Sequence, residues 1–267
     1  WFYTLHAIAT SCNAYFAHEY RKIVEKYPTP ALGIDAWNNH LKSFGLGQFL
    51  GSDFPIGRKG YVPDSKFYNR QYGENRWGAT YNISNGIGQG EVLVTPLQLA
   101  NVMAAIANKG YYYTPHIVKK IDEKVTPFTE YTAPKHTTIE EKYFAPVIQG
   151  MNLAYTDGTA RGTKIDSINI AAKTGTAENY TRINGVRMKL TDHSIFVAFA
   201  PIEDPKIVVA VFVENGSFGA RIAGPVTSLI IEKYLKGEVK RKELEKQMLE
   251  KSLEEEYERP CLLYTSP

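Results

Sequence analysis

Three strand-like segments in the second half of this 267-residue chain constrain its fold more than any other feature. The first ends in Ala171–Glu178, which reads A-A-K-T-G-T-A-E and follows a run rich in isoleucine. The other two are His193–Ala200 and Lys206–Val213, and the connection A-P-I-E-D-P-K between them has prolines at its edges, a composition typical of hairpin loops. Apolar, β-branched segments bounded by such turns predict paired strands of one sheet.

The segment Lys173–Thr176 places a lysine, a glycine and the hydroxyls of Thr174 and Thr176 at the start of what we expect to be an edge strand. An ammonium group and hydroxyls together bind a carboxylate. Gly175 lets another backbone approach closely, and the free strand edge offers main-chain hydrogen bonds. The sequence therefore predicts a site for an extended peptide that ends in a carboxylate. K-T-G is a short motif, so the rest of the chain must supply its context.

Composition argues against several classes of function. The net charge is +3 with both signs interspersed, which gives no indication of nucleic-acid binding. The six histidines lack metal-ligand spacing, and the two cysteines, Cys12 and Cys261, form no disulfide framework, although they are able to pair with each other. We therefore expect no metal and no cofactor.

The chain begins at Trp1 without a methionine, and it contains no apolar run of the roughly 18 residues that a membrane-spanning helix needs. Such a beginning is typical of a piece of a longer protein. We expect any membrane anchor or export signal to lie upstream of Trp1.

Residues 5–27 have apolar side chains at helical spacing, interrupted by T-S-C-N at Thr10–Asn13. The interruption predicts a short helix, a turn and a longer helix. Ser and Asn are common helix caps, so the simplest interpretation is that Ser11 and Asn13 cap the second helix. A functional role is the alternative, and it requires a partner elsewhere in the chain.

The segments that follow alternate between breaks and helices. P-T-P-A-L-G at 28–33 predicts a break, and Ala36–Phe44 predicts a helix that Gly45 ends. Residues 47–90 show no sustained periodicity and predict a long loop region whose aromatic side chains fix it in place. The glycines at 86–90 fit neither dinucleotide nor P-loop spacing.

A capping box predicts the start of the next helix, because Thr95 precedes Pro96 and Gln98 stands at the third helical position. This helix is apolar nearly all round up to Gly110, so we expect it to be buried. The remaining pattern predicts a strand at 111–121, a helix at 140–155, a glycine-bounded turn at 157–163 and an amphipathic helix at 225–235.

The C-terminal part changes character twice. Residues 236–258 are charge-dense with a thin apolar stripe, which indicates a solvated helix or, as the alternative, a partner-binding one. Residues 259–267, R-P-C-L-L-Y-T-S-P, depart abruptly from this pattern, and we interpret them as an artefactual tail outside the fold.

Three stretches together resemble a known family: S-C-N at Ser11–Asn13, N-G-I-G-Q-G-E-V-L-V-T-P-L-Q-L-A-N at 85–101, and K-T-G-T-A-E at 173–178. They resemble the transpeptidase domain of class B penicillin-binding proteins, and in particular the elongation-specific D,D-transpeptidases. The resemblance covers residues 1–237 and implies an α/β (α+β) fold, an antiparallel sheet flanked by helices and truncated at its N-terminus. It divides the chain into a partial transpeptidase domain at 1–237, a charged helical tail at 238–258 and the artefactual tail at 259–267.

One departure from the family pattern matters more than any match. The family's nucleophile is the serine of S-x-x-K, and none of the 267 residues begins such a motif. We expect the motif upstream of Trp1, and we expect the chain on its own to be inactive. A second S-x-N, Ser167–Asn169, lies too close to Lys173 on the same strand run to face it across a groove, so Ser11–Asn13 is the better match.

The resemblance implies a role for each matched residue. Lys173 attracts the substrate carboxylate and lowers the pKa of the S-x-x-K lysine, and Gly175 admits the substrate backbone. The hydroxyls of Thr174 and Thr176 bind the carboxylate, and the backbone N–H of Thr176 serves as an oxyanion-hole donor. Ser11 relays a proton to the leaving amine. The remaining matched residue, Asn13, holds the substrate amide.

The resemblance also implies partners and a location. The substrate is a peptidoglycan stem peptide ending in D-Ala-D-Ala, which β-lactams mimic. A membrane glycosyltransferase and proteins of the elongation complex are the expected partners, at the periplasmic face of the bacterial inner membrane. Four alternatives remain at this point: a serine β-lactamase, a β-lactam sensor, a carboxypeptidase, and a non-catalytic module that binds stem peptides or partner proteins.

Overall fold

The computed structural model describes residues 2–51, 53–54, 56–121, 124–125 and 129–258. These form two compact units, which are described one at a time. The first comprises Trp1–Ser11 and Pro146–Pro267, and the second comprises Cys12–Ala145. The predicted artefactual tail and Cys261, with any pairing to Cys12, lie outside the described residues. The predicted boundaries at 237 and 258 stay predictions.

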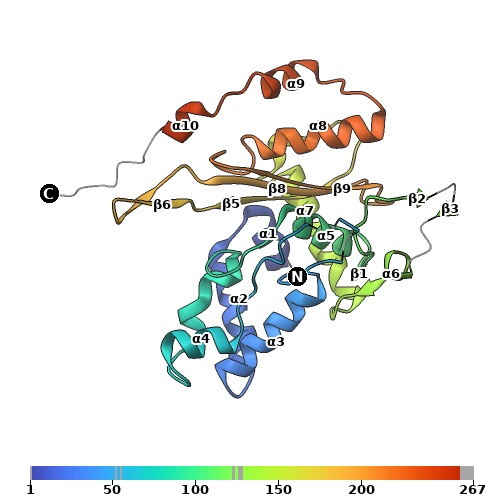
Figure 1. Cartoon of the computed structure of the whole chain (residues 1–267). Coiled ribbons are helices and arrows are strands. Elements are labelled where there is room, and N and C mark those ends of the chain that lie inside the picture. Colours follow the sequence, from blue (N-terminus) through green and yellow to red (C-terminus); the bar gives the residue numbers. More distant parts are fainter. Residues whose placement is uncertain (1, 52, 55, 122–123, 126–128, 259–267) are drawn as a thin grey trace. The chain divides into compact units, whose positions relative to one another are not determined.

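The first unit is built on an antiparallel sheet with strand order β5-β8-β9 (Figure 1). The strands are β5 (Ala171–Ala177), β8 (His193–Ala200) and β9 (Ile207–Val213). Lys173 pairs with Val197 and Thr174 with Phe196. Among the described strands β5 pairs only with β8, so it is an edge strand, as the sequence predicts.

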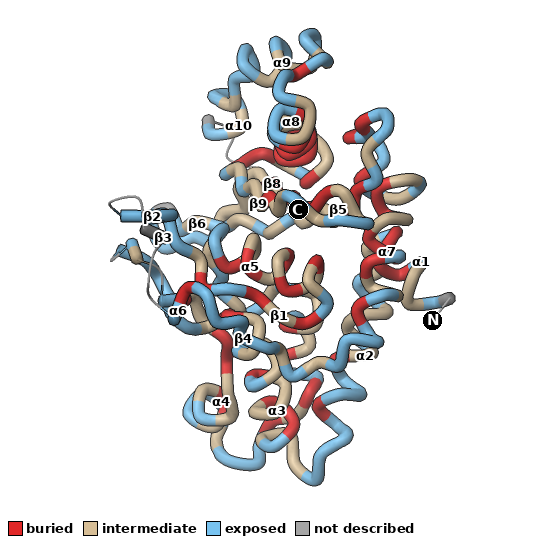
Figure 2. The backbone as a smooth tube through the Cα atoms, turned by 90° about the vertical axis from the view of Figure 1, so that its right-hand side faces the viewer, coloured by how far each residue is buried: buried red, intermediate tan, exposed pale blue. Residues whose placement is uncertain are grey.

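Helix α8 (Ala223–Lys236) covers one face of this sheet, packing on β8 and β9. Figure 2 shows its buried residues gathered toward the strands. The core there contains the buried side chains of Ala172, Phe196, Ala198 and Ile231. Burial of these apolar groups is the main stabilising term for the unit. Mixed helices and an antiparallel sheet confirm the predicted fold class.

Two further helices lie against each other in the first unit, which includes the second of them from Pro146 on. They are α1 (Phe2–Thr10) and α7 (Phe144–Thr156), and a Cβ added to Gly150 of α7 would stand 2.8 Å from the Ile8 side chain of α1. After α7, the predicted turn at 157–163 forms and ends in the short helix η3 (Arg161–Thr163). This turn connects α7 toward β5.

A hairpin that the sequence analysis missed extends from the end of β5 (Figure 1). It consists of β6 (Tyr180–Ile183) and β7 (Val186–Lys189). Asn184 and Gly185 have φ values of 51° and 82°, the left-handed pair that a two-residue hairpin turn requires. The signal is present in the sequence as N-G between the β-branched residues Ile183 and Val186.

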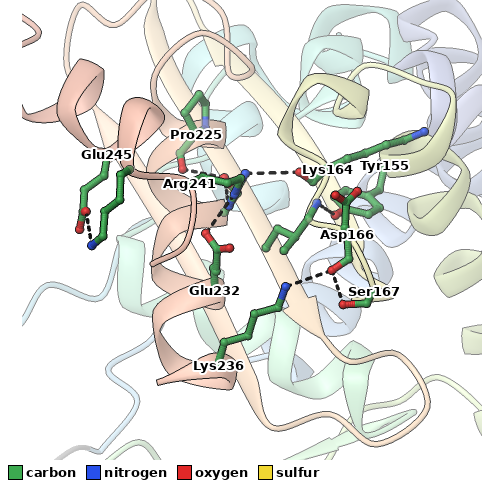
Figure 3. Close-up of polar contacts among 12 residues, drawn as sticks. Tyr155, Lys164, Asp166, Ser167, Pro225, Glu232, Lys236, Arg241 and Glu245 are labelled. Carbon is green, nitrogen blue, oxygen red and sulfur yellow. Dashed lines mark hydrogen bonds and ion pairs between the residues drawn. The ribbon is translucent and has the colours of Figure 1, made fainter. Parts of the chain in front are cut away.

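The charged tail is two helices rather than one, α9 (Lys242–Leu249) and α10 (Glu254–Glu258). Both helices are largely exposed to solvent, in agreement with the prediction of a solvated tail. Side chains of the tail also form hydrogen bonds with the rest of the first unit. Arg241 donates to the buried Glu232 of α8 at 3.0 Å (Figure 3). Further along, Arg221 donates to Glu256 at 2.7 Å.

The second unit is mainly helical. Its elements are α2 (Asn13–Glu25), α3 (Pro30–Ser43), α4 (Ser65–Tyr72), η1 (Ala79–Ile87), α5 (Pro96–Ala107), α6 (Thr129–Thr132) and η2 (Glu141–Tyr143), with the two-residue strands β1 (Tyr111–Tyr112), β2 (Lys120–Ile121), β3 (Lys124–Val125) and β4 (Lys135–His136). Tyr20, Val24, Ile34, Tyr68 and Trp77 form a core cluster. Tyr68 and Trp77 come from the predicted loop region, where aromatic side chains anchor the chain as expected.

Three predictions in this unit are wrong. The expected break at 28–33 is the start of α3, because Thr29 caps it and Pro30 occupies its first position. The supposed loop at 47–90 contains α4, which the Asp64 side chain caps, and η1. The expected strand at 111–121 is reduced to the dipeptides β1 and β2 at its ends.

The capping box at α5 is confirmed, with the Thr95 hydroxyl accepting from the backbone N–H of Gln98. Gln98 is almost fully buried, and its amide donates to the carbonyls of Gly45, Gln48 and Lys59. The helix is therefore not buried through apolar contacts alone. Its buried glutamine connects two loop segments, residues 45–48 and the segment of Lys59.

Candidate active site

The turn that ends α1 gives Ser11 an unusual backbone. Its φ is 55°, in the left-handed region that costs a non-glycine residue free energy. Its N–H donates to the carbonyl of Ile8 at 3.3 Å. The capping interpretation of Ser11 and Asn13 is wrong, because Cys12 is the N-cap of α2 and no side chain caps that helix end. The Ser11 hydroxyl is therefore available for another partner.

That partner is Lys173 of β5. The Lys173 ammonium donates to the Ser11 hydroxyl at 2.7 Å and to the carbonyl of Thr174 at 2.8 Å. Burial lowers the pKa of Lys173 from 10.5 to about 8, because the charged form loses hydration. Among the residues that the structure describes, Lys173 has no carboxylate partner. Its cation is held by neutral oxygens only.

Thr174 joins a third segment to this pair. Its hydroxyl lies 2.8 Å from the hydroxyl of Thr159, which belongs to the turn after α7. The N–H of Thr159 in turn donates to the carbonyl of Ala9 in α1 at 3.1 Å. Gly158 makes this approach feasible, because a Cβ there would stand 2.2 Å from the Ala9 carbonyl oxygen. The end of α1, the 157–160 turn and β5 therefore form one hydrogen-bonded group.

Strand geometry divides the predicted peptide-binding segment between two faces. Lys173 and Gly175 share one face of β5, and Thr174 and Thr176 share the other, which is the face of Phe196 and α8. Because β5 is an edge strand, both faces border the same open edge. The cation therefore lies on one side of that edge and the two hydroxyls lie on the other.

Gly175 has a steric role that the sequence did not indicate. A Cβ at this position would lie 3.1 Å from Cβ of Ile195 on the neighbouring strand. The backbone of β5 is also approached by the loop after β9, since a Cβ on Gly219 would stand 2.7 Å from the Gly175 carbonyl oxygen. The predicted role of Gly175, admission of a substrate backbone, stays a prediction.

Two predicted residues are not members of this hydrogen-bonded group. Asn13 is the exposed first residue of α2 and belongs to the second unit, whereas the hydrogen-bonded group lies wholly in the first. Thr176 is exposed two residues beyond Thr174 on β5. Their predicted roles, like those of Ser11, Lys173 and Thr174, stay predictions.

Thr159 is the site residue that sequence reasoning missed. The turn D-G-T-A-R-G-T was predicted, but nothing in its composition singles out one hydroxyl. Only the fold shows that this threonine stands beside Thr174. The second S-x-N motif has other partners: Ser167 donates to the carbonyl of Asp166, and Asn169 donates to Glu203 at 2.6 Å (Figure 3 shows the first contact).

No group of three or more metal-ligating side chains occurs within the described part of the chain. In the same residues, no helix has the length and apolar character to cross a membrane.

The family model described as "Penicillin binding protein transpeptidase domain" matches residues 4–232. This chain belongs to the penicillin-binding protein transpeptidase family. The resemblance seen in the motifs is thereby confirmed. The match includes Ser11, Lys173 and Thr159, so the hydrogen-bonded group lies within the family domain.

Individual relatives agree. The peptidoglycan D,D-transpeptidase MrdA of Acinetobacter baumannii is 33% identical over 233 residues, which are 82% of this chain and 33% of that protein. The crystal structure of Pseudomonas aeruginosa PBP2 in complex with WCK 5153 matches with a TM-score of 0.72 and 31% identity, covering 89% of this chain and 51% of that one. A complex between PBP2 and MreC from Helicobacter pylori matches with a TM-score of 0.66 and 27% identity, covering 87% and 40%. This penicillin-binding protein domain thus spans about a third of the length of the curated relative it matches.

Proposed function

We propose that this chain is part of a peptidoglycan D,D-transpeptidase that cross-links stem peptides through a serine acyl-enzyme. The observation that carries the proposal is the Lys173–Ser11 hydrogen bond at 2.7 Å beside an open strand edge. The name of the A. baumannii relative, peptidoglycan D,D-transpeptidase, supports it.

The reaction is an acyl transfer in two steps. In the first, a serine oxygen bonds to the penultimate carbonyl carbon, the D-Ala–D-Ala amide bond breaks, and D-alanine leaves with a proton on its amine. In the second, the amine of a neighbouring stem peptide takes the acyl group and the serine regains its proton. The nucleophile is the serine of S-x-x-K, which the full-length protein must supply, since the 267 residues contain no such motif.

Lys173 has two tasks in this proposal. With its pKa lowered to about 8 it is still mostly protonated at neutral pH, so its charge attracts the terminal carboxylate of the substrate. Because no described carboxylate neutralises it, that charge is fully available. Its hydrogen bond also orients the Ser11 hydroxyl, which passes a proton to the leaving amine.

The threonines complete the site. The hydroxyls of Thr174 and Thr176 bind the substrate carboxylate, and Thr159 orients the Thr174 hydroxyl through their 2.8 Å contact. The N–H of Thr176 donates to the developing oxyanion, a contribution typically of about 3–4 kcal/mol to the transition state. In this proposal Asn13 has the role of holding the substrate amide.

For the full-length protein we propose a place at the periplasmic face of the bacterial inner membrane. Its partners there are a membrane glycosyltransferase and proteins of the elongation complex. The structure of an H. pylori PBP2 bound to MreC supports a partner of the latter kind. β-Lactams, which mimic D-Ala-D-Ala, are the proposed inhibitors.

Labelling with fluorescent penicillin tests the proposal. The chain as given is compared with the full-length protein that contains S-x-x-K. We expect stable covalent labelling of the full-length protein only, and we expect Lys173→Ala to weaken it. Lys233→Ala, which removes an exposed lysine of α8, is the matched control and should label normally.

Two of the alternatives, a serine β-lactamase and a non-catalytic binding module, give different results. A β-lactamase would label briefly and release hydrolysed penicillin with many turnovers. A folded full-length protein that never labels would overturn the enzyme and favour a binding module.

A further inference from the structure

The loop between β9 and α8, residues 214–222, lies against β5. A Cβ added to Gly219 of this loop would stand 2.7 Å from the carbonyl oxygen of Gly175. On the neighbouring strand, the fully buried Ser194 donates its hydroxyl to the carbonyl of Phe218 at 3.1 Å. A hydrogen bond shielded from water in this way holds its geometry firmly. Any displacement of the loop therefore acts directly on the backbone of β5.

The backbone of this loop is strained. Asn215 and Ser217 have φ values of 52° and 67°, in the left-handed region that is unfavourable for residues other than glycine. Contacts from outside the loop hold it in this conformation. The N–H of Asn215 donates to the ring of His193 at 3.2 Å, and the N–H of Ser217 donates to the carbonyl of Asp192 at 2.8 Å. A strained loop keeps its shape only while its surroundings enforce it.

A further contact to the loop comes from the C-terminal segment, residues 241–257. Both oxygens of the Glu256 carboxylate are engaged. One accepts from Arg221 of the loop at 2.7 Å, and the other accepts from the hydroxyl of Thr191 at 3.1 Å. The Glu256 side chain is 19% exposed, so water and salt screen this ion pair only in part. Glu256 therefore connects the loop with the stretch of chain that enters β8.

The C-terminal segment is also fixed at its other end. Arg241 donates to the buried Glu232 of α8, and α9 packs on α8. Figure 1 shows the chain turning back after α8 and running toward the hairpin end of the sheet. The match to the family model ends at residue 232, so this segment lies outside the residues that define the family domain. The contact to the loop is therefore a feature of this chain rather than of the family match.

We propose that Glu256 is a positioning residue for acylation, because it holds the loop at 214–222 against β5. The inference rests on the proposed function, in which the N–H of Thr176 donates to the oxyanion. Such a donor is effective because it already points to where the charge develops, and a shift of its backbone removes that advantage. Loss of the Glu256 contact lets the strained loop relax and Gly219 withdraw from Gly175. The C-terminal segment thus affects the rate of acylation without contacting the substrate.

The test measures penicillin acylation of the full-length protein by stopped-flow labelling at several penicillin concentrations. This design separates the acylation rate constant from the affinity of the first, non-covalent complex. Glu256→Ala should lower the rate constant by about five- to tenfold, a part of the roughly 100-fold that loss of an oxyanion donor costs. The affinity of the non-covalent complex should change by less than about twofold, because an interaction of the transition state alone is weakened.

Three further variants are matched to this one. Glu254→Ala removes an exposed glutamate from the same helix and should acylate at the parent rate. Arg221→Ala should also be slow, and combining it with Glu256→Ala should add little, because both break one contact. Glu256→Gln keeps the shape of the side chain and one acceptor oxygen. Its rate should lie between those of the parent and Glu256→Ala.

Hydrogen exchange separates positioning from a general loss of stability. In Glu256→Ala the amides of the loop and of β5 should exchange faster, whereas those of α7 should exchange as in the parent. If Glu256→Ala unfolds below the assay temperature, Glu256→Gln takes its place in both measurements. Faster exchange throughout the protein, with a rate of acylation that falls only in step with the folded fraction, would make the contact structural and overturn the inference.

Two other results count against the inference. One is a parent rate in both Glu256→Ala and Arg221→Ala, and the other is full additivity of the two changes. Absence of labelling in the folded parent would instead overturn the proposed function. Unchanged exchange of β5 in Glu256→Ala overturns the inference whether or not the protein labels, so the two failures are distinguishable.

Discussion

Lys173 and Arg241 are two partly buried cations of the same unit, and their surroundings differ in one respect. Arg241 has a buried carboxylate partner, since its guanidinium donates to Glu232, a side chain that is 2% exposed. It also donates to the Ser228 hydroxyl and to the Lys164 carbonyl, and Figure 3 shows the second of these contacts. Lys173 has only a hydroxyl and a carbonyl as acceptors.

The difference separates a structural cation from one suited to binding. A guanidinium held by a carboxylate and two further acceptors has no free donor face left for a ligand. A buried ammonium without a counter-ion has a lowered pKa, because burial disfavours its charged form, and it attracts a carboxylate that arrives. The same unit therefore fixes its C-terminal segment with one cation and keeps the other available.

The largest expected effect comes from breaking the structural pair. Arg241→Met leaves the Glu232 carboxylate buried without its partner, so the free energy of unfolding should fall by about 3–5 kcal/mol. Urea denaturation measures it. Lys242→Met, which removes an exposed contact to Glu245, is the control and should change the value by less than about 1 kcal/mol. Replacing both partners, Arg241→Met with Glu232→Leu, should recover most of the loss; no recovery would contradict this account.

Lys173→Met should show the opposite pattern. Stability should change by no more than about 1 kcal/mol, because the variant removes a desolvated charge and leaves no buried ion unpaired. The rate of penicillin acylation in the full-length protein should nevertheless fall by about 100-fold, the size of effect typical for a lost electrostatic contact in an active site. Stopped-flow labelling measures the rate. A large loss of stability with a normal rate would make Lys173 structural.

The pH dependence of stability sharpens the comparison. The folded pKa of Lys173, about 8, lies below its usual value of 10.5, so burial disfavours the charged form in the folded state. The cost is present in full below pH 8 and decreases as pH rises from 8 to 10.5, because the unfolded chain then binds more protons. Between pH 8 and 10.5 the free energy of unfolding of the parent should therefore rise by about 1–3 kcal/mol relative to that of Lys173→Met. Denaturation at intervals of pH measures the gain, and a flat difference would contradict it.

The smallest expected effect concerns Ser11. Ser11→Ala and Ser11→Gly both remove the hydroxyl that Lys173 contacts, but only glycine tolerates a φ of 55° without strain. The glycine variant should therefore be more stable than the alanine variant by about 1 kcal/mol. Thermal unfolding of the two variants side by side measures the difference. Equal stability would mean that the turn relaxes to another conformation.

Local signals in the sequence predicted a good part of this protein. The strands that carry Lys173 and its neighbours, and the capping box of Thr95 and Gln98, were predicted because short-range patterns of burial and capping determine them. Local signals also mark the start of α3 at Thr29–Pro30 and the turn at Asn184–Gly185, but the sequence analysis does not predict either feature.

Other features depend on chain segments that are far apart in the sequence. The sequence by itself determined that a lysine, a serine and several threonines of suitable chemistry are present. Only the tertiary structure decided that Ser11, 162 residues from Lys173, supplies its acceptor and that Thr159 stands beside Thr174. It also decided which cation is neutralised, because pairing with Glu232 depends on how the chain turns back after α8. Hydrogen bonds and desolvation act over a few ångströms, and a linear sequence does not record which residues come within that distance.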